Sequence, residues 1–418
     1  MNKIYLCIDL KTFYASVECV ERGLDPFKTR LVVADKERGS GTICLAVSPK
    51  MKELGVKNRC RLFEIPKSIT YIAAKPRMKL YIKYSADIYG IYLKYVDKDD
   101  IHVYSIDECF IDATKYLKLY QKSAETFAKL IIDDIYNIFK ITATAGIGTN
   151  LYLAKIALDI SAKHNKSNIA YLDEELYKKT LWSHTPPTDF WQIGKGIEKR
   201  LNKHHLYTME DVSKCDSLVL YKEFGVNAEY LIDHANGIEP VTIKDIKKYK
   251  SQSQSLSYGQ VLFEDYDYEH ALLVVKEMVE LACLDLVDKQ LVTNNLFLSI
   301  GYSKDVIKST GSSIKILEQT NSYKTINSYF MELFDKNTNH NYPIRRISLG
   351  FNNVIREEDK EANLFTDVEE EAKEKRVQKA ILDIKKKFGK NAILKGMNLE
   401  DKATTISRNK LVGGHNGE

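Results

Sequence analysis

The strongest constraint in this sequence is a pair of adjacent acids inside a short apolar segment. Residues 102–114 read HVYSIDECFIDAT, a run typical of a β-strand, yet Asp107 and Glu108 interrupt it near its middle. A buried carboxylate without a partner is costly, because removal from water disfavours its charged form. The chain therefore has to bring these two acids to solvent, to a cation or to hydrogen-bond donors.

A third acid, Asp9, follows the apolar N-terminal run KIYLCI within residues 3–10, which also predict a strand. If both strands belong to one sheet, the three carboxylates can converge, and their mutual repulsion raises their pKa values. Divalent cations remove that penalty, and Mg²⁺ is commonly held by a few carboxylates together with substrate phosphates. Two such ions can align the attacking and leaving oxygens of phosphoryl transfer. From spacing alone, solvated acids at strand ends are an equally good interpretation.

Composition indicates a soluble protein of several domains. A chain of 418 residues exceeds one ordinary core and predicts about three or four domains. The formal charge of +5 permits nucleic-acid binding without requiring it. The seven cysteines include no CxxC pair, so they suit neither a zinc site nor a disulfide framework and indicate a reducing compartment. The N-terminus lacks a signal-peptide pattern and no apolar run is long enough to span a membrane, so we expect a cytoplasmic protein.

Strand and helix patterns alternate at first and predict an α+β domain that ends near residue 170. Residues 171–236 then read as short helices and turns, and 241–250, VTIKDIKKYK, as an extended basic linker. The alternation returns over 251–355 and predicts a second, smaller α+β domain. From 356 onward the chain is highly charged, and we expect a tail that is partly disordered.

Three segments, in order, resemble the signature segments of the Y-family translesion DNA polymerases, most closely those of the UmuC-like (ImpB/MucB/SamB-type) branch. They are IDLKTFYASVE (8–18), YSIDECFID (104–112) and TAGIGTNLYLAKIA (144–157). The resemblance implies an α+β multidomain fold, a right-hand polymerase with palm, small fingers, helical thumb and little finger. The implied palm consists of 1–10 and 78–170 and the implied fingers of 11–77, so that the two together span 1–170. They are followed by a thumb with a helix-hairpin-helix (171–240), the basic linker (241–250), the little finger (251–355) and a charged tail (356–418).

In this family the acids are metal ligands, so the resemblance implies that Asp9, Asp107 and Glu108 hold two Mg²⁺ ions. The backbone carbonyl of Leu10 would complete the metal on the nucleotide side. SIDE would lie at the tip of a β-hairpin, which presents both of its acids to one site. A primer 3′-hydroxyl would then attack the α-phosphate of an incoming dNTP, and pyrophosphate would leave.

Residues around the acids receive roles in the same way. Tyr14 matches the steric gate that excludes ribonucleotides, although a core aromatic on an amphipathic helix is its other interpretation. Phe13 is implied to cradle the nucleotide through its backbone and ring edge. Asp112 lies beyond the hairpin tip and is predicted to be structural or solvated. Gly146 and Gly148 are predicted to support the sheet behind the site rather than to bind phosphate.

The predicted triphosphate contacts depart from the family pattern. The usual Tyr and Arg of the fingers helix align with Pro49 and Lys52, so one contact is missing or comes from Ser48. Lysine can hold a phosphate as a point charge but lacks the fork geometry of arginine. Lys163 matches the palm lysine that reaches the phosphates, although one extra residue precedes it. A solvated lysine at a helix end is the alternative.

DNA contacts are predicted from basic segments. FWQIGKGIEKRLNKHHLYTMEDV (190–212) has the pattern of a helix-hairpin-helix, whose glycines leave backbone N–H groups free to face a phosphate. An ordinary helical turn with surface lysines is the alternative. The predicted DNA-binding residues are Gly194, Lys195, Gly196, Lys199, Arg200, Lys244, Lys247, Lys248 and Lys250. None of them reads bases, so we expect nonspecific, salt-sensitive binding.

A final motif lies in the charged tail. EANLF (361–365) resembles the segment by which bacterial polymerases dock on the sliding clamp, with Glu361 in place of the usual Gln. Leu364 and Phe365 would fill an apolar pocket, unless they are a chance apolar pair. We therefore expect a monomeric, low-fidelity translesion DNA polymerase that acts on primer-template DNA and dNTP in the cytoplasm, near the nucleoid, as part of DNA repair and the SOS response. A metal-dependent nuclease and a non-catalytic DNA-binding scaffold are the alternatives.

Overall fold

The acid-bearing strands of the sequence pair with each other in one five-stranded sheet. The computed structural model describes residues 3–251, 254–303, 306–360 and 368–418. The sheet has the order β5-β6-β1-β7-β8, and β1 runs antiparallel to both β6 and β7. Its strands are β1 (Tyr5–Leu10), β5 (Ile101–Val103), β6 (Glu108–Asp112), β7 (Ala143–Gly148) and β8 (Ile169–Leu172). Both acid segments therefore belong to one sheet, which is the condition for their carboxylates to converge.

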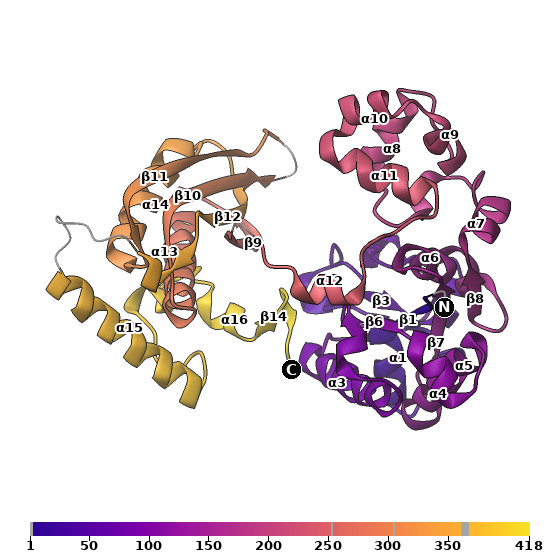
Figure 1. Cartoon of the computed structure of the whole chain (residues 1–418). Helices are drawn as coiled ribbons and strands as arrows, with labels where there is room; N and C mark the ends of the chain where they lie inside the picture. Colours follow the sequence, from indigo (N-terminus) through magenta and orange to yellow (C-terminus); the bar gives the residue numbers. More distant parts are fainter. Residues whose placement is uncertain (1–2, 252–253, 304–305, 361–367) are drawn as a thin grey trace. The chain divides into compact units, whose positions relative to one another are not determined.

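Helices cover this sheet and form the expected palm (Figure 1). They are α3 (Met78–Tyr95), α4 (Thr114–Tyr120), α5 (Ala124–Phe139) and α6 (Leu151–Ile156). Helix α6 lies directly on β7 because Gly146 and Gly148 have no side chains. A Cβ at either glycine would lie 2.1 Å from a backbone atom of Ala154. The predicted supporting role of these two glycines is therefore confirmed.

The expected fingers form a small three-stranded sheet of order β3-β2-β4. Strand β2 (Leu31–Val33) pairs antiparallel with β3 (Ala46–Val47) and parallel with β4 (Ile72–Ala74). Helix α1 (Phe13–Val20) precedes this sheet, and α2 (Pro49–Glu53) follows β3.

Short helices make up the expected thumb, as predicted: α7 (Glu174–Thr180), α8 (Lys195–Asn202), α9 (Met209–Lys214), α10 (Ser217–Phe224) and α11 (Ala228–Ala235). Their core includes Tyr152 and Leu153 of α6. The predicted helix-hairpin-helix segment, 190–212, includes α8 and the start of α9, and a 3₁₀ turn, Pro187–Asp189, precedes it.

The prediction of an extended linker over 241–250 is wrong. Residues Ile243–Lys248 form helix α12, whose start is fixed by a capping box between Thr242 and Asp245. Ile243 is 2% exposed and lies in a cluster with Tyr5 of the palm. Apolar residues at positions 243 and 246 share one helix face, and this face rather than the lysines determines the structure.

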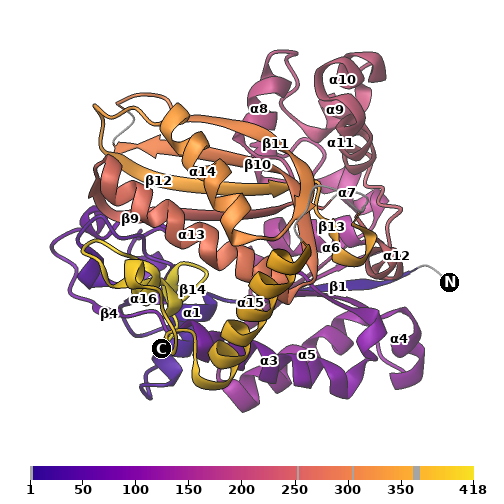
Figure 2. The same cartoon turned by 90° about the vertical axis from the view of Figure 1, so that its left-hand side faces the viewer.

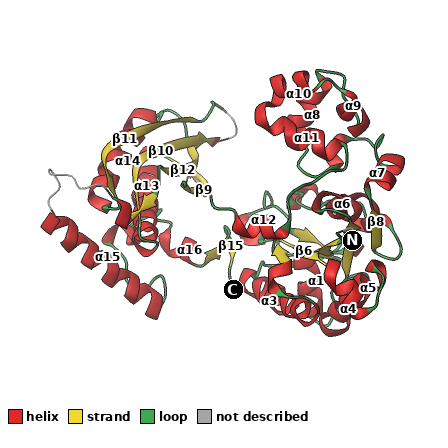
Figure 3. Cartoon of the chain, in the orientation of Figure 1, coloured by secondary structure: helices red, strands yellow, loops and turns green. Residues whose placement is uncertain are grey.

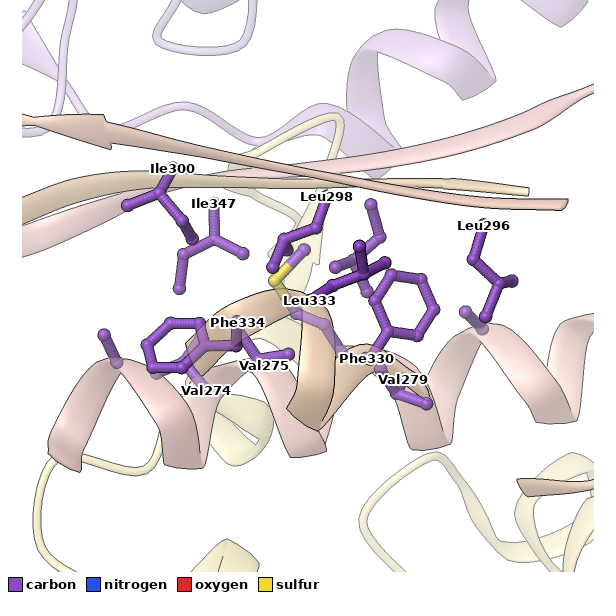
Figure 4. Packing of buried hydrophobic residues seen from close by; sticks show 14 of the residues in the cluster. Val274, Val275, Val279, Leu296, Leu298, Ile300, Phe330, Leu333, Phe334 and Ile347 are labelled. Carbon is purple, nitrogen blue, oxygen red and sulfur yellow. The ribbon is translucent and has the colours of Figure 1, made fainter. Parts of the chain in front are cut away.

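The chain divides into two units, and the boundary lies between Tyr249 and Lys250. The second unit contains an antiparallel sheet of order β11-β10-β12-β9. Its strands are β9 (Leu256–Tyr266), β10 (Leu291–Tyr302), β11 (Thr310–Thr320) and β12 (Ile344–Asn352), and β13 (Ile355–Arg356) also pairs with β10. Helices α13 (Tyr268–Asp288) and α14 (Tyr323–Asn337) lie on one face of this sheet (Figure 2). Leu298, Phe330 and Val275 meet in its core (Figure 4). This is the second α+β domain that the sequence predicts.

The expectation of a partly disordered tail is wrong over residues 368–417. This segment contains α15 (Val368–Phe388), α16 (Thr405–Asn409), β14 (Leu411–Val412) and β15 (His415–Asn416), as Figure 3 shows. Glu277 of α13 is 1% exposed, and its carboxylate accepts four hydrogen bonds from the segment. Asn398 Nδ2 and Thr405 N donate at 3.1 Å, and the backbone N and Oγ1 of Thr404 at 2.7 and 2.9 Å. The segment is therefore part of the second unit. No helix of the described residues has the length and apolarity needed to cross a membrane.

Candidate active site

The SIDE segment forms the tip of a β-hairpin, as predicted. Strands β5 and β6 pair antiparallel, and the backbone N–H groups of Tyr104 and Ser105 both donate to the Glu108 carbonyl at 3.0 Å. Ser105 Oγ donates to Asp107 Oδ1 at 2.8 Å, which orients that carboxylate. Asp9 lies directly opposite Glu108 in the register of β1 with β6. Three acids from two distant segments therefore meet at one end of the sheet.

Asp9 is the most perturbed of these acids. Burial raises the pKa of Asp9, Lys163 partly offsets the rise, and Asp107 and Glu108 add to it, so the pKa reaches about 6. Lys163 Nζ lies 3.4 Å from Asp9 Oδ2. The prediction that neighbouring acids raise one another's pKa is confirmed for Asp9. Asp112 is structural, as predicted, because its Oδ1 accepts from the backbone N–H of Thr114 at 3.0 Å.

Glu108 is held by a lysine that the sequence reasoning missed. Lys155 Nζ lies 2.7 and 2.8 Å from the two Glu108 oxygens and 3.0 Å from Asp159, and Cys7 Sγ donates to Glu108 at 3.2 Å. Burial lowers the pKa of Lys155, but Cys7, Glu108 and Asp159 more than offset this, so the net direction is upward. The missed signal is Lys155 itself, a charge within the otherwise apolar LYLAKIAL.

The donor set fits a magnesium site only in part. Within the described residues, no three His, Cys, Asp or Glu side chains are placed so that they could hold a metal ion together. Asp107 and Glu108 both raise the pKa of Asp9, so the three carboxylates share one region, but Glu108 is already bonded to Lys155. Mg²⁺ needs only one or two protein carboxylates when substrate phosphates and water complete its octahedron. Asp9 and Asp107 therefore fit one ion, and Glu108 can join only by exchanging its bond to Lys155.

Tyr14 stands on a rigid support beside these acids. Its ring stacks on Tyr81 with centroids 4.5 Å apart and 19° between the planes. Tyr81 Oη donates to Glu18 at 2.7 Å, and Arg77 donates two hydrogen bonds of 2.9 Å to the same carboxylate. Tyr14 is only partly buried, in contrast to the fully buried Glu18. Burial and Asp107 raise the pKa of Tyr14, which places its hydroxyl in the field of the acid cluster.

Glu18 anchors this support, and the sequence reasoning missed it. Burial alone would raise the pKa of Glu18, but hydrogen bonds from Arg77, Tyr81 and Arg22 lower it overall. An acid at the end of the apolar helix pattern FYASVE was the available signal.

Two side chains predicted to contact the nucleotide are buried. The Phe13 ring belongs to the core with 2% exposure, so its ring edge is not available to a ligand, whereas a contact through its backbone stays a prediction. Ser48 is 0% exposed and caps α2: its hydroxyl donates to the Thr29 carbonyl at 2.6 Å and accepts from the N–H of Met51 at 3.3 Å. Serine before a proline at the first helical position is a typical N-cap, and this local role accounts for Ser48.

A π-helix explains the extra residue before Lys163. Helix α6 continues as a π-helix over Ala157–Ser161, whose wider turn accommodates one additional residue. Lys163 consequently lies 3.4 Å from Asp9 and 2.7 Å from Asp159. Lys163 is also 37% exposed at the end of this helical segment, as a solvated lysine would be, so its contact with a phosphate stays a prediction.

Lys52 and a further lysine, Lys11, complete the cationic side of the site. Burial lowers the pKa of Lys52, Asp9 counteracts this, and Lys163 adds to the lowering. The same holds for Lys11, where Asp9 counteracts burial and both Lys52 and Lys163 lower the pKa further. Lys163 thus lies 3.4 Å from Asp9, and Lys11, whose ammonium donates to Asn168 Oδ1, and Lys52 are near enough to interact electrostatically with Asp9 and with Lys163. Lys11 was missed, although its place directly after the acid-bearing strand was a signal.

The predicted DNA-binding residues fall into two groups. Lys195 and Lys199 are exposed on α8, and a Cβ at Gly194 or Gly196 would meet nothing within 4 Å, so this helix start is open. Arg200 is instead bound to Glu223 at 2.8 Å and lies over the Phe224 ring at 4.3 Å.

Among the α12 lysines, Lys247 donates to the Lys98 carbonyl and lies 3.8 Å from Asp99. Lys244, Lys248 and Lys250 are exposed. Leu364 and Phe365 of the predicted clamp motif lie outside the described residues.

Comparisons with known proteins agree with this arrangement. The impB/mucB/samB family matches residues 8–159, and the C-terminal domain of the same family matches residues 249–364. The "Putative UV-damage repair protein UvrX" of Bacillus subtilis (strain 168) is 32% identical over 99% of this chain and 98% of its own length. A "DNA polymerase IV 2" from the same strain is 30% identical over 99% of both chains. A protein of the same name from Halalkalibacterium halodurans is 26% identical over 99% of this chain and 100% of its own length.

Solved structures show the same fold. The Y-family DNA polymerase chimera Dbh-Dpo4(243-245)-Dbh matches with a TM-score of 0.64 at 22% identity, covering 84% of this chain and 99% of the other. An insertion ternary complex of Dbh DNA polymerase covers the same shares with a TM-score of 0.53 at 22% identity. The α+β multidomain polymerase fold that the sequence predicts is thereby confirmed.

Proposed function

Because this chain belongs to the impB/mucB/samB family and is a Y-family translesion DNA polymerase, we propose that the acid cluster of its palm is the nucleotidyl-transfer site. Asp9, Asp107 and Glu108 would serve the transfer of a dNTP to a primer 3′-hydroxyl. The observation that carries this assignment is the meeting of these acids beside a stacked Tyr14 and three lysines. Acids alone would suit a nuclease equally well, whereas the lysines and Tyr14 provide a place for a triphosphate and a sugar.

We propose Mg²⁺ as the cofactor, held by Asp9, Asp107 and the Leu10 carbonyl, with Glu108 joining when it leaves Lys155. When bound, Mg²⁺ would lower the pKa of the primer hydroxyl and neutralise charge on the phosphates. The site balances its own charges before any ligand arrives. The cluster contains four acids, Asp9, Asp107, Glu108 and Asp159, and four lysines, Lys11, Lys52, Lys155 and Lys163. Added cations therefore require added anions, which favours joint binding of metal and nucleotide.

The lysines are proposed to hold the triphosphate. Lys11, Lys52 and Lys163 repel one another around Asp9, and a polyanion would relieve that repulsion. Pro49 has no side-chain donor for a phosphate, and Lys11 would in part take over that role. Tyr14 would lie where the 2′-hydroxyl of a ribose would be. Its stacking on Tyr81 would prevent the Tyr14 ring from moving aside to admit that hydroxyl.

DNA binding is proposed for the predicted basic residues that are exposed, except Lys247, which donates to the Lys98 carbonyl. These are Lys195 and Lys199 with Gly194 and Gly196 at the start of α8, together with Lys244, Lys248 and Lys250. Steep weakening of binding from low to moderate salt would support phosphate tracking, and a flat response would contradict it.

The clamp remains a proposed partner through Leu364 and Phe365. Loss of clamp-stimulated synthesis in the double alanine variant would support this contact, and unchanged stimulation would count against it. Cytoplasmic localisation with the nucleoid is likewise proposed.

The decisive experiment is primer extension with Mg²⁺ on undamaged and lesion-bearing templates. Asp107→Asn should abolish extension, because it removes a proposed metal ligand. Asp112→Asn is the matched control, since Asp112 lies in the same hairpin but bonds Thr114 instead. It should leave extension largely intact. Shortening of the primer would indicate a nuclease, and binding without either change would indicate a scaffold.

A further inference from the structure

Two cysteines of the fingers lie opposite each other across an antiparallel bridge. Ile43 pairs with Arg61 outside the named strands. On one side of this bridge the N–H of Cys44 donates to the Cys60 carbonyl at 2.8 Å, and on the other the N–H of Leu62 donates to the Thr42 carbonyl at 3.0 Å. This pattern makes Cys44 and Cys60 directly opposed residues, and opposed side chains in an antiparallel pair share one face.

The shared face is the core of the fingers. Cys44 is 0% exposed and Cys60 is half-buried against the same cluster, which contains Val47 and Met51. Burial raises the pKa of the Cys44 thiol to about 12, and the neighbouring Cys60, with which it forms a side-chain hydrogen bond, contributes to the rise. Tyr71, like Cys60, packs against this cluster.

Backbone geometry of this kind suits a disulfide. Opposed residues that share a backbone hydrogen bond have Cα atoms about 5.5 Å apart. Disulfides span Cα separations of about 4.4–6.8 Å, so closure needs side-chain rotation and little backbone movement. The reciprocal backbone bond is absent here, because Arg59 at a φ of 62° donates to the Cys44 carbonyl in place of Cys60. This irregularity gives the Cys60 strand local freedom to adjust.

We propose that Cys44 and Cys60 form a reversible disulfide when the protein meets a disulfide oxidant of the glutathione class. The half-buried Cys60 thiolate would attack oxidised glutathione, forming a Cys60–glutathione mixed disulfide and releasing one glutathione thiolate. Cys44 would then attack the Cys60 sulfur as its proton passes to the departing second glutathione, which leaves as the thiol. The protein loses two hydrogens and two electrons, and one oxidised glutathione becomes two reduced molecules.

The closed loop would contain residues 45–59, including α2 and Lys52. A cross-link restricts the open conformations of the segment it encloses, so the amide protons of α2 should exchange more slowly. Any effect of the disulfide on nucleotide affinity rests on the proposed function of Lys52. The formation of the disulfide does not depend on that proposed function. The formation of the bond can therefore be tested without measuring polymerase activity.

The test is incubation of the whole protein with oxidised glutathione, followed by peptide mapping under non-reducing conditions. The expected product is one peptide pair joined through Cys44 and Cys60, 2 Da lighter than its reduced parts and separated by a reductant. Cys60→Ser should abolish it. Cys215→Ser, which removes a half-buried cysteine of the thumb, is the matched control and should leave the yield unchanged.

Two outcomes would overturn the proposal. One is a stable glutathione adduct on Cys60 of the wild-type protein without the joined peptides, which would show that Cys44 cannot reach it. The other is recovery of both thiols unmodified after prolonged exposure. Hydrogen exchange on the oxidised wild-type protein provides a second measurement that needs no variant: unchanged exchange in α2 would refute the predicted restriction of the enclosed segment.

Discussion

Asp9 and Glu18 lie in one sequence motif but should affect stability in opposite directions when neutralised. Burial raises the pKa of Asp9, Lys163 partly counteracts the rise and the neighbouring acids add to it, so that the pKa goes from 3.8 to about 6. This difference corresponds to roughly 3 kcal/mol of unfavourable free energy in the folded state, because each tenfold change in a proton equilibrium is worth about 1.4 kcal/mol.

The sign follows from proton linkage. Between about pH 4 and pH 6 the folded protein binds a proton that the unfolded chain releases, so stability falls as the pH rises through this window. Above about pH 7 the whole cost is present, and below about pH 4 it is absent. Asp9→Asn cannot ionise, so it should raise the free energy of unfolding by up to about 3 kcal/mol at neutral pH and by little in acid.

Glu18→Gln provides the contrast. Burial alone would raise the pKa of Glu18, but Arg77, Tyr81 and Arg22 donate hydrogen bonds to its carboxylate and lower it overall. Removing this charge leaves their donors poorly matched inside the protein, which should cost at least about 2 kcal/mol at neutral pH. The two variants therefore separate an acid whose charge destabilises the fold, and which we propose to be functional, from an acid whose charge stabilises the fold.

Urea unfolding in the presence of a chelator measures both effects. Both tryptophans of the chain, Trp182 and Trp191, belong to the first unit, so their fluorescence reports the unfolding of the unit that contains the acids. Asp9→Asn should be the more stable protein and inactive in primer extension. The reasoning is refuted if Asp9→Asn is no more stable than the wild type at neutral pH, or if its gain does not diminish in acid.

Further substitutions test the remaining contacts. Lys155→Met should lower the free energy of unfolding by about 3–5 kcal/mol, because Glu108 would stay buried without its cation, and Lys155→Met/Glu108→Gln should recover most of that loss in a double-mutant cycle. Tyr14→Ala should reduce the preference for dNTP over NTP by more than about tenfold in kcat/KM, since the ring that would meet the 2′-hydroxyl is gone; an unchanged ratio would remove Tyr14 from the gate. Gly148→Ala should lower Tm by well over 10 °C or prevent folding, because its Cβ would meet the backbone at 2.1 Å. Gly90→Ala, in open space on α3, should raise stability by about 0.5–1 kcal/mol. Lys11→Ala should raise the KM for dNTP several-fold with a smaller change in kcat, and an equal result for exposed Lys57→Ala would assign the effect to general charge.

The position of the acid cluster could be predicted from sequence because the context of these acids is unusual. Asp107 and Glu108 lie in an apolar strand pattern. The cost of burying their charges is avoided only at a hairpin tip or beside a charged partner. Short-range signals also located the elements well: Pro49 with Ser48 marks the start of α2, and the glycines at 146 and 148 mark the close approach of α6.

Other features depend on contacts that no local pattern contains. Lys155 reaches Glu108 across 47 positions, and Arg77 reaches Glu18 across 59. Residues 241–250 looked extended because their lysines dominate the composition, yet burial of Ile243 folds them into α12. The C-terminal segment looked disordered because its charge is high, but Glu277 supplies a buried acceptor more than a hundred residues away. A high density of charged residues predicts a disordered, solvated segment only where no buried hydrogen-bonding partner elsewhere in the chain binds that segment.

The π-helical turn at Ala157–Ser161 also bears on how such chains diverge. A π-helical turn can accommodate one inserted residue without displacing the residues that follow it. Lys163 therefore still reaches Asp9. Spacing between motifs can therefore drift while geometry is preserved, so a search that scores fixed spacing would discard a lysine that the fold retains. Insertion or deletion of one residue in this turn should preserve the contact between Lys163 and Asp9, whereas substitution of Lys163 would remove it. Deleting one residue from the turn should restore a regular helix and leave the lysine where it stands.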